Sequence, residues 1–164
     1  MKIRRANISD SSAIVEIYNW YIENTTITFE TIPVSVEEMN NRIEDKLVNY
    51  DWFVAELNDK VIGYAYYGAF RTRVAYQHTV ETAIYLSPEF KGNGIGSLLY
   101  AQLFDSANDK GFREMLAVVA LPNSDSIRFH KKMGFTEVGL MKKIGYKFNE
   151  YIDVSFLQKS LYNN

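Results

Sequence analysis

Residues 78–104 read His-Thr-Val-Glu-Thr-Ala-Ile-Tyr-Leu-Ser-Pro-Glu-Phe-Lys-Gly-Asn-Gly-Ile-Gly-Ser-Leu-Leu-Tyr-Ala-Gln-Leu-Phe. A strand-like run at 79–86 enters a turn rich in proline and glycine, which opens directly into a helical pattern at 95–108. Backbone N–H groups and the positive end of a helix dipole therefore meet at one point, which favours a bound anion such as phosphate. The carboxylate of Glu81, on the strand just ahead, indicates chemistry beside that anion site.

Strand and helix patterns continue on both sides of this stretch. Alternating or continuous apolar runs predict strands, and apolar residues at helical spacing predict helices. Strands are expected at residues 2–6, 52–57, 61–70, 79–86, 115–121, 135–140 and 151–161, and helices at 10–24, 35–48, 95–108 and 123–133. This order, with a hairpin formed by the second and third strands, predicts an α/β fold with a mixed sheet rather than a doubly wound parallel one.

Single residues refine the expected boundaries. Ser9 is the expected N-cap of the first helix, and Ser35 with Glu38 matches a capping box for the second. Gly63 and Gly68 lie inside a strand pattern, which suggests a bulge or a close approach of another group to the backbone.

Composition limits the class of protein. The 164 residues are expected to form one domain, 1–164, and an apolar content of 47% argues against disorder. A net charge of −2 gives no reason to expect nucleic acid or an anionic membrane as a partner. There is no cysteine, so no disulfide or thiolate metal site is expected, and no metal is predicted. Nothing resembles a signal peptide or a membrane span, so a cytoplasmic location is expected.

The glycine-rich turn has several possible interpretations. It lacks the Gly-Lys-Ser/Thr ending of an ATP-type phosphate loop, and no acidic residue ends a following strand to hold a ribose. An ordinary turn with a helix cap is an alternative. Against it, Gly96 falls inside the helical run, where glycine costs about 1 kcal/mol relative to alanine. The density of glycine indicates that a ligand approaches the backbone closely.

The segment Lys91-Gly92-Asn93-Gly94-Ile95-Gly96 resembles the Gln/Arg-x-x-Gly-x-Gly/Ala acetyl-CoA signature of the GCN5-related N-acetyltransferases (GNAT). Asn123 followed by Met133-Gly134-Phe135 resembles a second segment of that family. Within it, the chain is most similar to the phosphinothricin and methionine sulfone/sulfoximine acetyltransferases. The stretches that carry this similarity are 28–31, 52–56, 73–76, 79–82, 117–123, 145–148 and 153–154. Lys91 departs from the signature, but only its backbone amide is needed there.

The resemblance implies a GNAT fold, with a mostly antiparallel, twisted sheet of about seven strands flanked by about four helices. It also implies acetyl-CoA as co-substrate and no metal. The strand backbone at 84–86 would pair with the pantetheine amides. The expected cofactor-binding residues are Ile84, Tyr85, Leu86, Lys91, Gly92, Asn93, Gly94, Ile95, Gly96, Ser97, Asn123, Ser126 and Lys131.

The resemblance also assigns catalytic roles. Glu81 is the expected general base, and His130 the second catalytic residue, as a proton donor to the leaving thiolate or to the oxyanion. The alternatives are an ion-paired strand carboxylate and a structural histidine on a helix face; His78, with no motif behind it, is expected to be structural. Deprotonating an α-amine of pKa ~7.8 at pH 7 costs about 1 kcal/mol, against about 4–5 for a lysine amine of pKa ~10.4. A single Glu therefore favours an α-amino acid as acceptor.

For the acceptor, the resemblance implies a pocket lined by Phe29 and Arg73, with Arg73 binding a carboxylate or phosphinate. Arg71 is an alternative clamp, and Tyr76 a candidate at the rim. The subfamily builds this pocket at a two-fold interface, so a homodimer is expected. Two other functions stay open: acetylation of protein N-termini or lysines, and a catalytically silent CoA-binding sensor.

Overall fold

A seven-stranded sheet forms the centre of the molecule in the computed structural model, which describes residues 1–162. The strands are β1 (Lys2–Arg5), β2 (Trp52–Leu57), β3 (Lys60–Ala69), β4 (Thr79–Leu86), β5 (Glu114–Ala120), β6 (Thr136–Lys147) and β7 (Glu150–Ser160). Their order is β1-β2-β3-β4-β5-β7-β6, and all neighbours are antiparallel except β4 with β5. This confirms the expected mixed, mostly antiparallel sheet.

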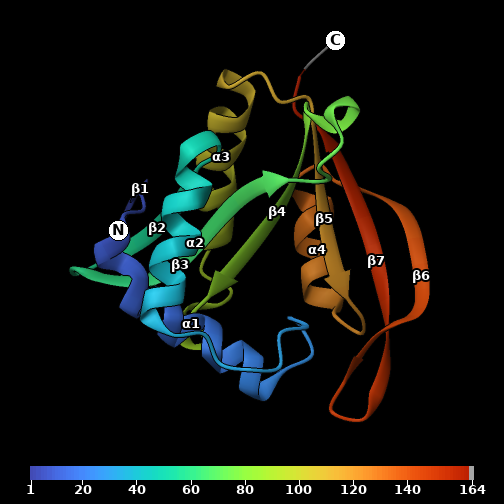
Figure 1. Cartoon of the computed structure of the whole chain (residues 1–164), viewed down its shortest axis with the longest axis horizontal. Coiled ribbons are helices and arrows are strands. Elements are labelled where there is room, and N and C mark those ends of the chain that lie inside the picture. Colours follow the sequence, from blue (N-terminus) through green and yellow to red (C-terminus); the bar gives the residue numbers. More distant parts are fainter. Residues whose placement is uncertain (163–164) are drawn as a thin grey trace.

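Helices cover both faces of the sheet (Figure 1). Within the described residues they are α1 (Ser11–Asn24), α2 (Val36–Asn49), α3 (Ile95–Asp109) and α4 (Ser124–Lys132). Short 3-10 turns occupy Ile8–Asp10, Val74–Tyr76 and Pro88–Phe90. The predicted helices are thus all present.

Two apolar cores lie on opposite faces of the sheet because successive strand residues point to opposite sides. On one face, α1 and α2 pack on residues such as Val54 and Tyr64. On the other face, α3 and α4 pack on residues such as Ala65 and Val80. Burying each large apolar side chain contributes about 1.5–3 kcal/mol, so this double layer fixes the positions of the strands.

The N-terminal helix begins differently from the prediction. Asn7, not Ser9, is the cap, and it caps the 3-10 turn Ile8–Asp10 that leads into α1: its side chain accepts from the Ser9 amide at 2.9 Å, and the Asp10 carboxylate accepts from the Asn7 amide at 3.0 Å. Arg4 holds the same carboxylate at 2.7 Å. This second partner for Asp10 comes from β1, so local spacing did not indicate it.

The second helix is capped by Ser35 as predicted, since its hydroxyl accepts from the Glu38 amide at 3.1 Å. The reciprocal half of the capping box is replaced by another contact. The Glu38 carboxylate accepts from Arg42 Nε at 2.9 Å, one helical turn along α2. The Glu38 carboxylate binds the Arg42 guanidinium rather than the Ser35 amide because a charge-assisted hydrogen bond is stronger than a bond to a neutral amide.

The strand predicted at 135–140 is much longer in the structure, because β6 runs to Lys147. It forms a hairpin with β7 through Phe148 and Asn149, both in the left-handed region with φ of 52° and 61°. Two consecutive positive φ values match the twist of a tight hairpin. Irregular pairing between Met141 and Gly145 breaks the alternation, which explains why the pattern did not predict this half of β6.

Strands β4 and β5 separate at the middle of the sheet. Their parallel pairing runs from Thr79–Glu114 to Thr82–Ala117 and then stops, although both strands continue. Figure 1 shows the two strands spreading apart toward the N-terminal ends of α3 and α4. The divergence leaves one edge of β4 residues 83–86 unpaired with β5.

Candidate active site

The gap between β4 and β5 offers backbone groups rather than side chains. The Ile84 side chain lies near Gly96 of α3, and the Tyr85 ring packs against Tyr18 and Tyr21 on the opposite face. The Leu86 carbonyl already accepts from the Tyr21 hydroxyl at 2.7 Å. Of this strand segment, the unpaired backbone edge is therefore what a ligand can reach.

The glycine-rich turn forms a cradle of amides at the start of α3. Gly92 and Gly94 adopt φ of 83° and 76°, and a Cβ on either would meet nothing within 4 Å. The backbone N–H groups of residues 92–96 have no acceptor in the part of the chain that the structure describes. Unpaired amides at a helix N-terminus favour an anion, so the cradle fits a phosphate group.

The other members of the turn are placed less uniformly. Gly96 is buried, and a Cβ there would lie 3.1 Å from the Phe129 ring of α4, so packing between helices explains this glycine. The Lys91 ammonium lies 5.0 Å from the centre of the Tyr21 ring. The Asn93 amide group donates to the Phe90 carbonyl at 3.5 Å, while Ser97 is half-buried in the first turn of α3.

The residues predicted on α4 mostly have partners within the protein. The Asn123 side chain caps the helix by accepting from the Ser126 amide at 3.1 Å. Lys131 forms an ion pair of 2.5 Å with Glu137 of β6. These contacts match the structural alternative for Asn123 and Lys131, whose free capacity for a ligand is correspondingly smaller.

His130 lies inside the protein, 3% exposed, among the rings of Tyr100, Phe129 and Phe135. Its Nδ1 is 2.8 Å from the Ser126 carbonyl oxygen, so Nδ1 carries the proton and donates it. Its Nε2 then accepts from the Tyr100 hydroxyl, also at 2.8 Å. Burial lowers the pKa of His130, only partly opposed by the Ser126 contact, so the ring is neutral at pH 7. With both nitrogens occupied, the geometry favours a structural role.

Glu81 lies on the α1/α2 face of β4, half-buried and directly opposite Gly68 of β3. Burial raises the pKa of Glu81, and the nearby Lys46 ammonium opposes that rise. A carboxylate with a raised pKa is a better proton acceptor than one with an ordinary pKa. Its position on the strand that borders the β4/β5 gap suits a general base.

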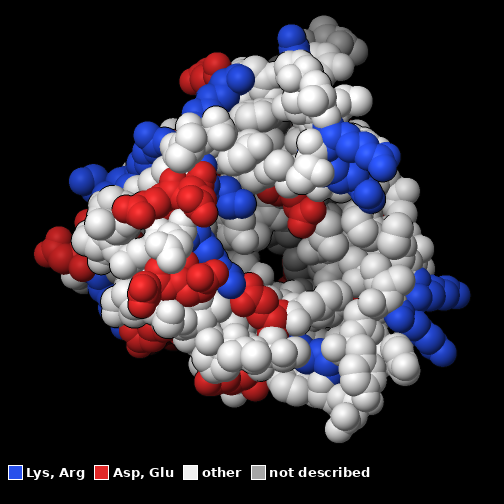
Figure 2. All heavy atoms as spheres, viewed as in Figure 1, with Lys and Arg blue, Asp and Glu red and all other residues white. Residues whose placement is uncertain are grey.

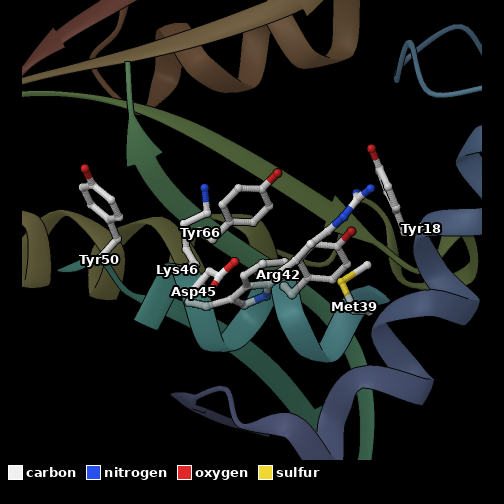
Figure 3. A pocket seen from close by; sticks show the side chains of 9 residues that line it. Tyr18, Met39, Arg42, Asp45, Lys46, Tyr50 and Tyr66 are labelled. Carbon is white, nitrogen blue, oxygen red and sulfur yellow. The ribbon is translucent and has the colours of Figure 1, made fainter. Parts of the chain in front are cut away.

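A hollow of about 380 Å³ lies between α2 and strands β2 and β3, one strand away from Glu81 on β4 (Figure 3). Its lining residues are Tyr18, Met39, Arg42, Asp45, Lys46, Tyr50, Trp52, Tyr64 and Tyr66. Figure 3 shows Lys46 and Tyr66 pointing side by side into the open space. Figure 2 shows a deep depression at the centre of the molecule, where Figure 1 has β4 between α2 and α4.

The loop between α1 and α2 reaches across to the β6–β7 hairpin. The Phe29 ring covers Gly145, where a Cβ would come within 3.0 Å of three ring atoms. The buried Lys147 ammonium donates to the Thr28 carbonyl at 2.9 Å. On the helix side, the Glu30 carboxylate binds Arg42 at 2.6 Å. The loop therefore connects α2 to the far end of the sheet.

The loop at 71–78 is exposed and separate from the hollow. The Arg71 guanidinium lies over the Phe70 ring at 5.1 Å and over the Tyr76 ring at 6.0 Å. Arg73 precedes the 3-10 turn and forms no ion pair with any residue from 1 to 162. Neither arginine lines the hollow of Figure 3.

No group of three or more His, Cys, Asp or Glu side chains between residues 1 and 162 is placed to hold a metal ion. Over the same residues, none of the helices has the length and apolar character needed to cross a membrane.

A sequence profile described as an acetyltransferase (GNAT) domain matches residues 3–156. The chain belongs to the GNAT acetyltransferase family. This confirms the family expected from the turn at 91–96, and the seven-stranded sheet with its helices is the GNAT fold.

Individual relatives agree with this GNAT assignment. Phosphinothricin N-acetyltransferase of Streptomyces viridochromogenes is 38% identical over 159 residues, 97% of this chain and 87% of that one. The L-methionine sulfoximine/L-methionine sulfone acetyltransferase of Salmonella typhimurium is 35% identical over 162 residues, 98% and 95% of the two chains. A phosphinothricin acetyltransferase of Sinorhizobium meliloti, crystallised with acetyl-CoA, has a TM-score of 0.93 at 40% identity, covering 97% and 87%.

Within this GNAT domain, the amide cradle lies at the start of α3, toward which the gap beside the open edge of β4 widens. Glu81 lies on the face of β4 that is directed toward α1 and α2. The structure does not bring Arg71 and Arg73 to the hollow. Sequence reasoning missed Lys46 and Arg42, the two cations of α2 that line it. Their only sequence signal was indirect: Gly68, inside a strand, indicated that some group approaches the backbone closely.

Proposed function

We propose that this chain transfers an acetyl group from acetyl-CoA to the α-amino group of a small amino acid or amino acid analogue. Phosphinothricin, methionine sulfone and methionine sulfoximine are the acceptor types named for its relatives. The observation that carries the proposal is Glu81, a half-buried carboxylate with a raised pKa on the strand that borders the β4/β5 gap. Relatives and site chemistry agree on an amine acceptor.

The cofactor side rests on the cradle at 92–96 and on the open edge of β4. The pyrophosphate of acetyl-CoA would accept from the unpaired amides, where Gly92 and Gly94 leave space that a Cβ would occupy. The backbone at 84–86 would pair with the pantetheine amides. When bound, acetyl-CoA supplies an activated acyl thioester. Secondary candidates for contacts with acetyl-CoA are Lys91, Ser97, Asn123, Ser126 and Lys131.

Glu81 would act as the general base. It accepts a proton from the α-ammonium group, directly or through water, and leaves a neutral amine. The amine nitrogen then bonds to the acetyl carbonyl carbon, the carbon–sulfur bond breaks, the nitrogen gives up its surplus proton, and the departing thiolate takes up a proton. For an α-amine the deprotonation costs about 1 kcal/mol at pH 7, within reach of a single carboxylate.

The acceptor pocket includes Phe29 and, in this proposal, residues from the 71–78 loop: Arg73, Arg71 and Tyr76. Because this loop is exposed, we propose that a second copy of the chain completes the pocket. Strand β6 supports a homodimer, since it is an edge strand with many exposed apolar side chains. These are Val138, Leu140, Met141, Ile144 and Tyr146, and Phe148 in the adjoining hairpin turn is exposed as well.

A thiol-release assay with acetyl-CoA tests the function. The acceptors are methionine sulfone, methionine sulfoximine, phosphinothricin and a lysine-containing peptide. Release of CoA with the amino acids but not with the peptide is expected. Turnover of the peptide alone would favour protein acetylation, and no turnover at all would favour a CoA-binding sensor.

A further inference from the structure

Lys46 of α2 reaches the sheet at the position opposite the proposed base. Its terminal methylenes and ammonium lie directly over Gly68, where a Cβ would collide with the ammonium nitrogen. Gly68 is the cross-strand partner of Glu81. The missing side chain at Gly68 therefore makes the space that admits Lys46 to the surface beside Glu81.

The Lys46 ammonium has no anionic partner in the described chain. Within residues 1–162 it forms neither a hydrogen bond nor an ion pair of 4.0 Å or less; besides lying over Gly68, it is 5.2 Å from the centre of the Tyr66 ring. Arg42, one turn earlier, is bound by Glu30 at 2.6 Å and Glu38 at 2.9 Å. Because a half-buried charge without a counterion is costly, Lys46 suits an anion supplied from outside.

Glu81 and Lys46 are opposite charges on neighbouring elements that do not form an ion pair with one another. The burial of both groups disfavours their charged forms, and each offsets part of that effect for the other. An α-amino acid carries an ammonium group and a carboxylate on the same carbon. Its charges are the complement of the Glu81 and Lys46 pair.

We propose that Lys46 binds the α-carboxylate of the acceptor while Glu81 accepts the proton of its α-amine. This inference rests on the proposed function and names the part of the acceptor that the site recognises. It makes a free α-carboxylate a requirement, because a peptide or an amide lacks that charge. Arg73 is then left for the polar group at the far end of the acceptor side chain.

The competing explanation is that Lys46 serves only as the counterion of Glu81. Both explanations predict that the loss of the cation weakens activity. Only binding of the α-carboxylate by Lys46 predicts that the loss of activity depends on whether the acceptor has a carboxylate. Deleting each charge separately, on the enzyme and on the acceptor, tells them apart.

The experiment measures kcat/KM of the wild type, Lys46→Met and Lys46→Arg with methionine sulfone and with its α-carboxamide. For the wild type, the carboxamide should be poorer by about tenfold to a hundredfold, the value of a charge-assisted hydrogen bond. Lys46→Met should lose about the same factor with the acid and less than about threefold with the carboxamide. Lys46→Arg should keep most of the preference for the acid. Acetyl-CoA affinity and the unfolding midpoint serve as controls for folding.

Equal losses with both acceptors in Lys46→Met, or a wild type that does not distinguish them, would overturn the inference and leave the proposed function standing. The wild-type comparison needs no variant, so it decides even if Lys46→Met does not fold. A wild type that acetylates neither compound, nor any other small amino acid, would overturn the proposed function and this inference with it.

Discussion

The ring of Phe29 lies over the backbone of Gly145, although the two residues belong to opposite ends of the chain. The adjacent Thr28 carbonyl accepts from the Lys147 ammonium at 2.9 Å. Two consecutive loop residues are thus attached to β6. The position of Phe29 in the proposed acceptor pocket depends on a glycine in the C-terminal hairpin.

Gly145→Ala is therefore expected to displace Phe29. Its φ is not in the left-handed region, so the effect comes from the collision with the ring rather than from backbone strain. The acceptor KM should rise severalfold, as it should in Phe29→Ala, and the double variant should be no worse than the worse single one. The measurement is a double-mutant cycle on KM. Gly139→Ala is the matched control, because a Cβ there meets only Phe156 at 4.0 Å.

Glu81→Gln keeps the size of the side chain and removes the proton acceptor. We expect kcat at neutral pH to fall by about 10²–10³-fold, the usual contribution of a general base. The dissociation constant of acetyl-CoA, measured by calorimetry, should change less than about twofold. A comparable loss of cofactor affinity would instead assign Glu81 a structural role.

Lys46 should also set the pH at which the enzyme becomes active. Glu81 works as a base when ionised, so activity is lost as the pH falls through its pKa. Burial raises that pKa and Lys46 opposes the rise; removing the cation in Lys46→Met should therefore move the acidic limb of the kcat profile to higher pH. Lys46→Arg should keep the wild-type limb. An unchanged acidic limb in Lys46→Met would mean that the charge of Lys46 does not affect the pKa of Glu81.

The other charged groups near Lys46 are held constant in this comparison. Arg42 remains paired with Glu30 and Glu38, and Asp45 lines the hollow from the same helix. Because none of these residues is altered, a shift of the limb reports on Lys46 and Glu81.

Arg73→Ala should raise the KM of the acceptor by about tenfold or more and leave the KM of acetyl-CoA unchanged, because an arginine fork contributes a charge-assisted, bidentate contact. Arg73→Lys should recover only part of the loss, since lysine keeps the charge and not the fork. Steady-state kinetics with each substrate varied in turn measure both constants. An acceptor KM that does not respond would leave the exposed loop at 71–78 outside the pocket.

The parts of the site that the sequence could predict depend on local chemistry. The turn at 92–96 was recognisable because left-handed backbone and unpaired amides require glycines next to a helix start. The cap formed by Ser35 has the same local origin. Lys46 and the Phe29–Gly145 contact depend on how α2 and a long loop lie across the sheet. No spacing rule encodes that packing, and only the glycines at 68 and 145 mark it.

The role of His130 likewise depends on burial, which its motif does not show. Its two hydrogen bonds come from Tyr100, thirty residues away, and from the preceding turn of its own helix. The motif alone suggested a proton donor. The structure supplies the competing explanation, because a neutral imidazole with both nitrogens bonded has no proton directed at the β4/β5 gap.

His130 should therefore affect stability and its pH dependence more than catalysis. Burial lowers its folded-state pKa below the unfolded value of about 6.5. The unfolded chain then binds a proton that the folded chain does not, so stability decreases as the pH falls below about 6.5 and on through the lower folded-state pKa. His130→Phe should lose about 1–3 kcal/mol at pH 8, because the Tyr100 hydroxyl and the Ser126 carbonyl lose their partner.

The same variant should lose less stability than the wild type between pH 7 and pH 5.5, since phenylalanine does not titrate. Urea denaturation at several pH values measures both effects. At pH 8, and at a temperature well below the unfolding midpoint of the variant, kcat should fall less than about tenfold. A fall of about 10²-fold or more in a folded variant would restore His130 as the proton donor to the leaving thiolate.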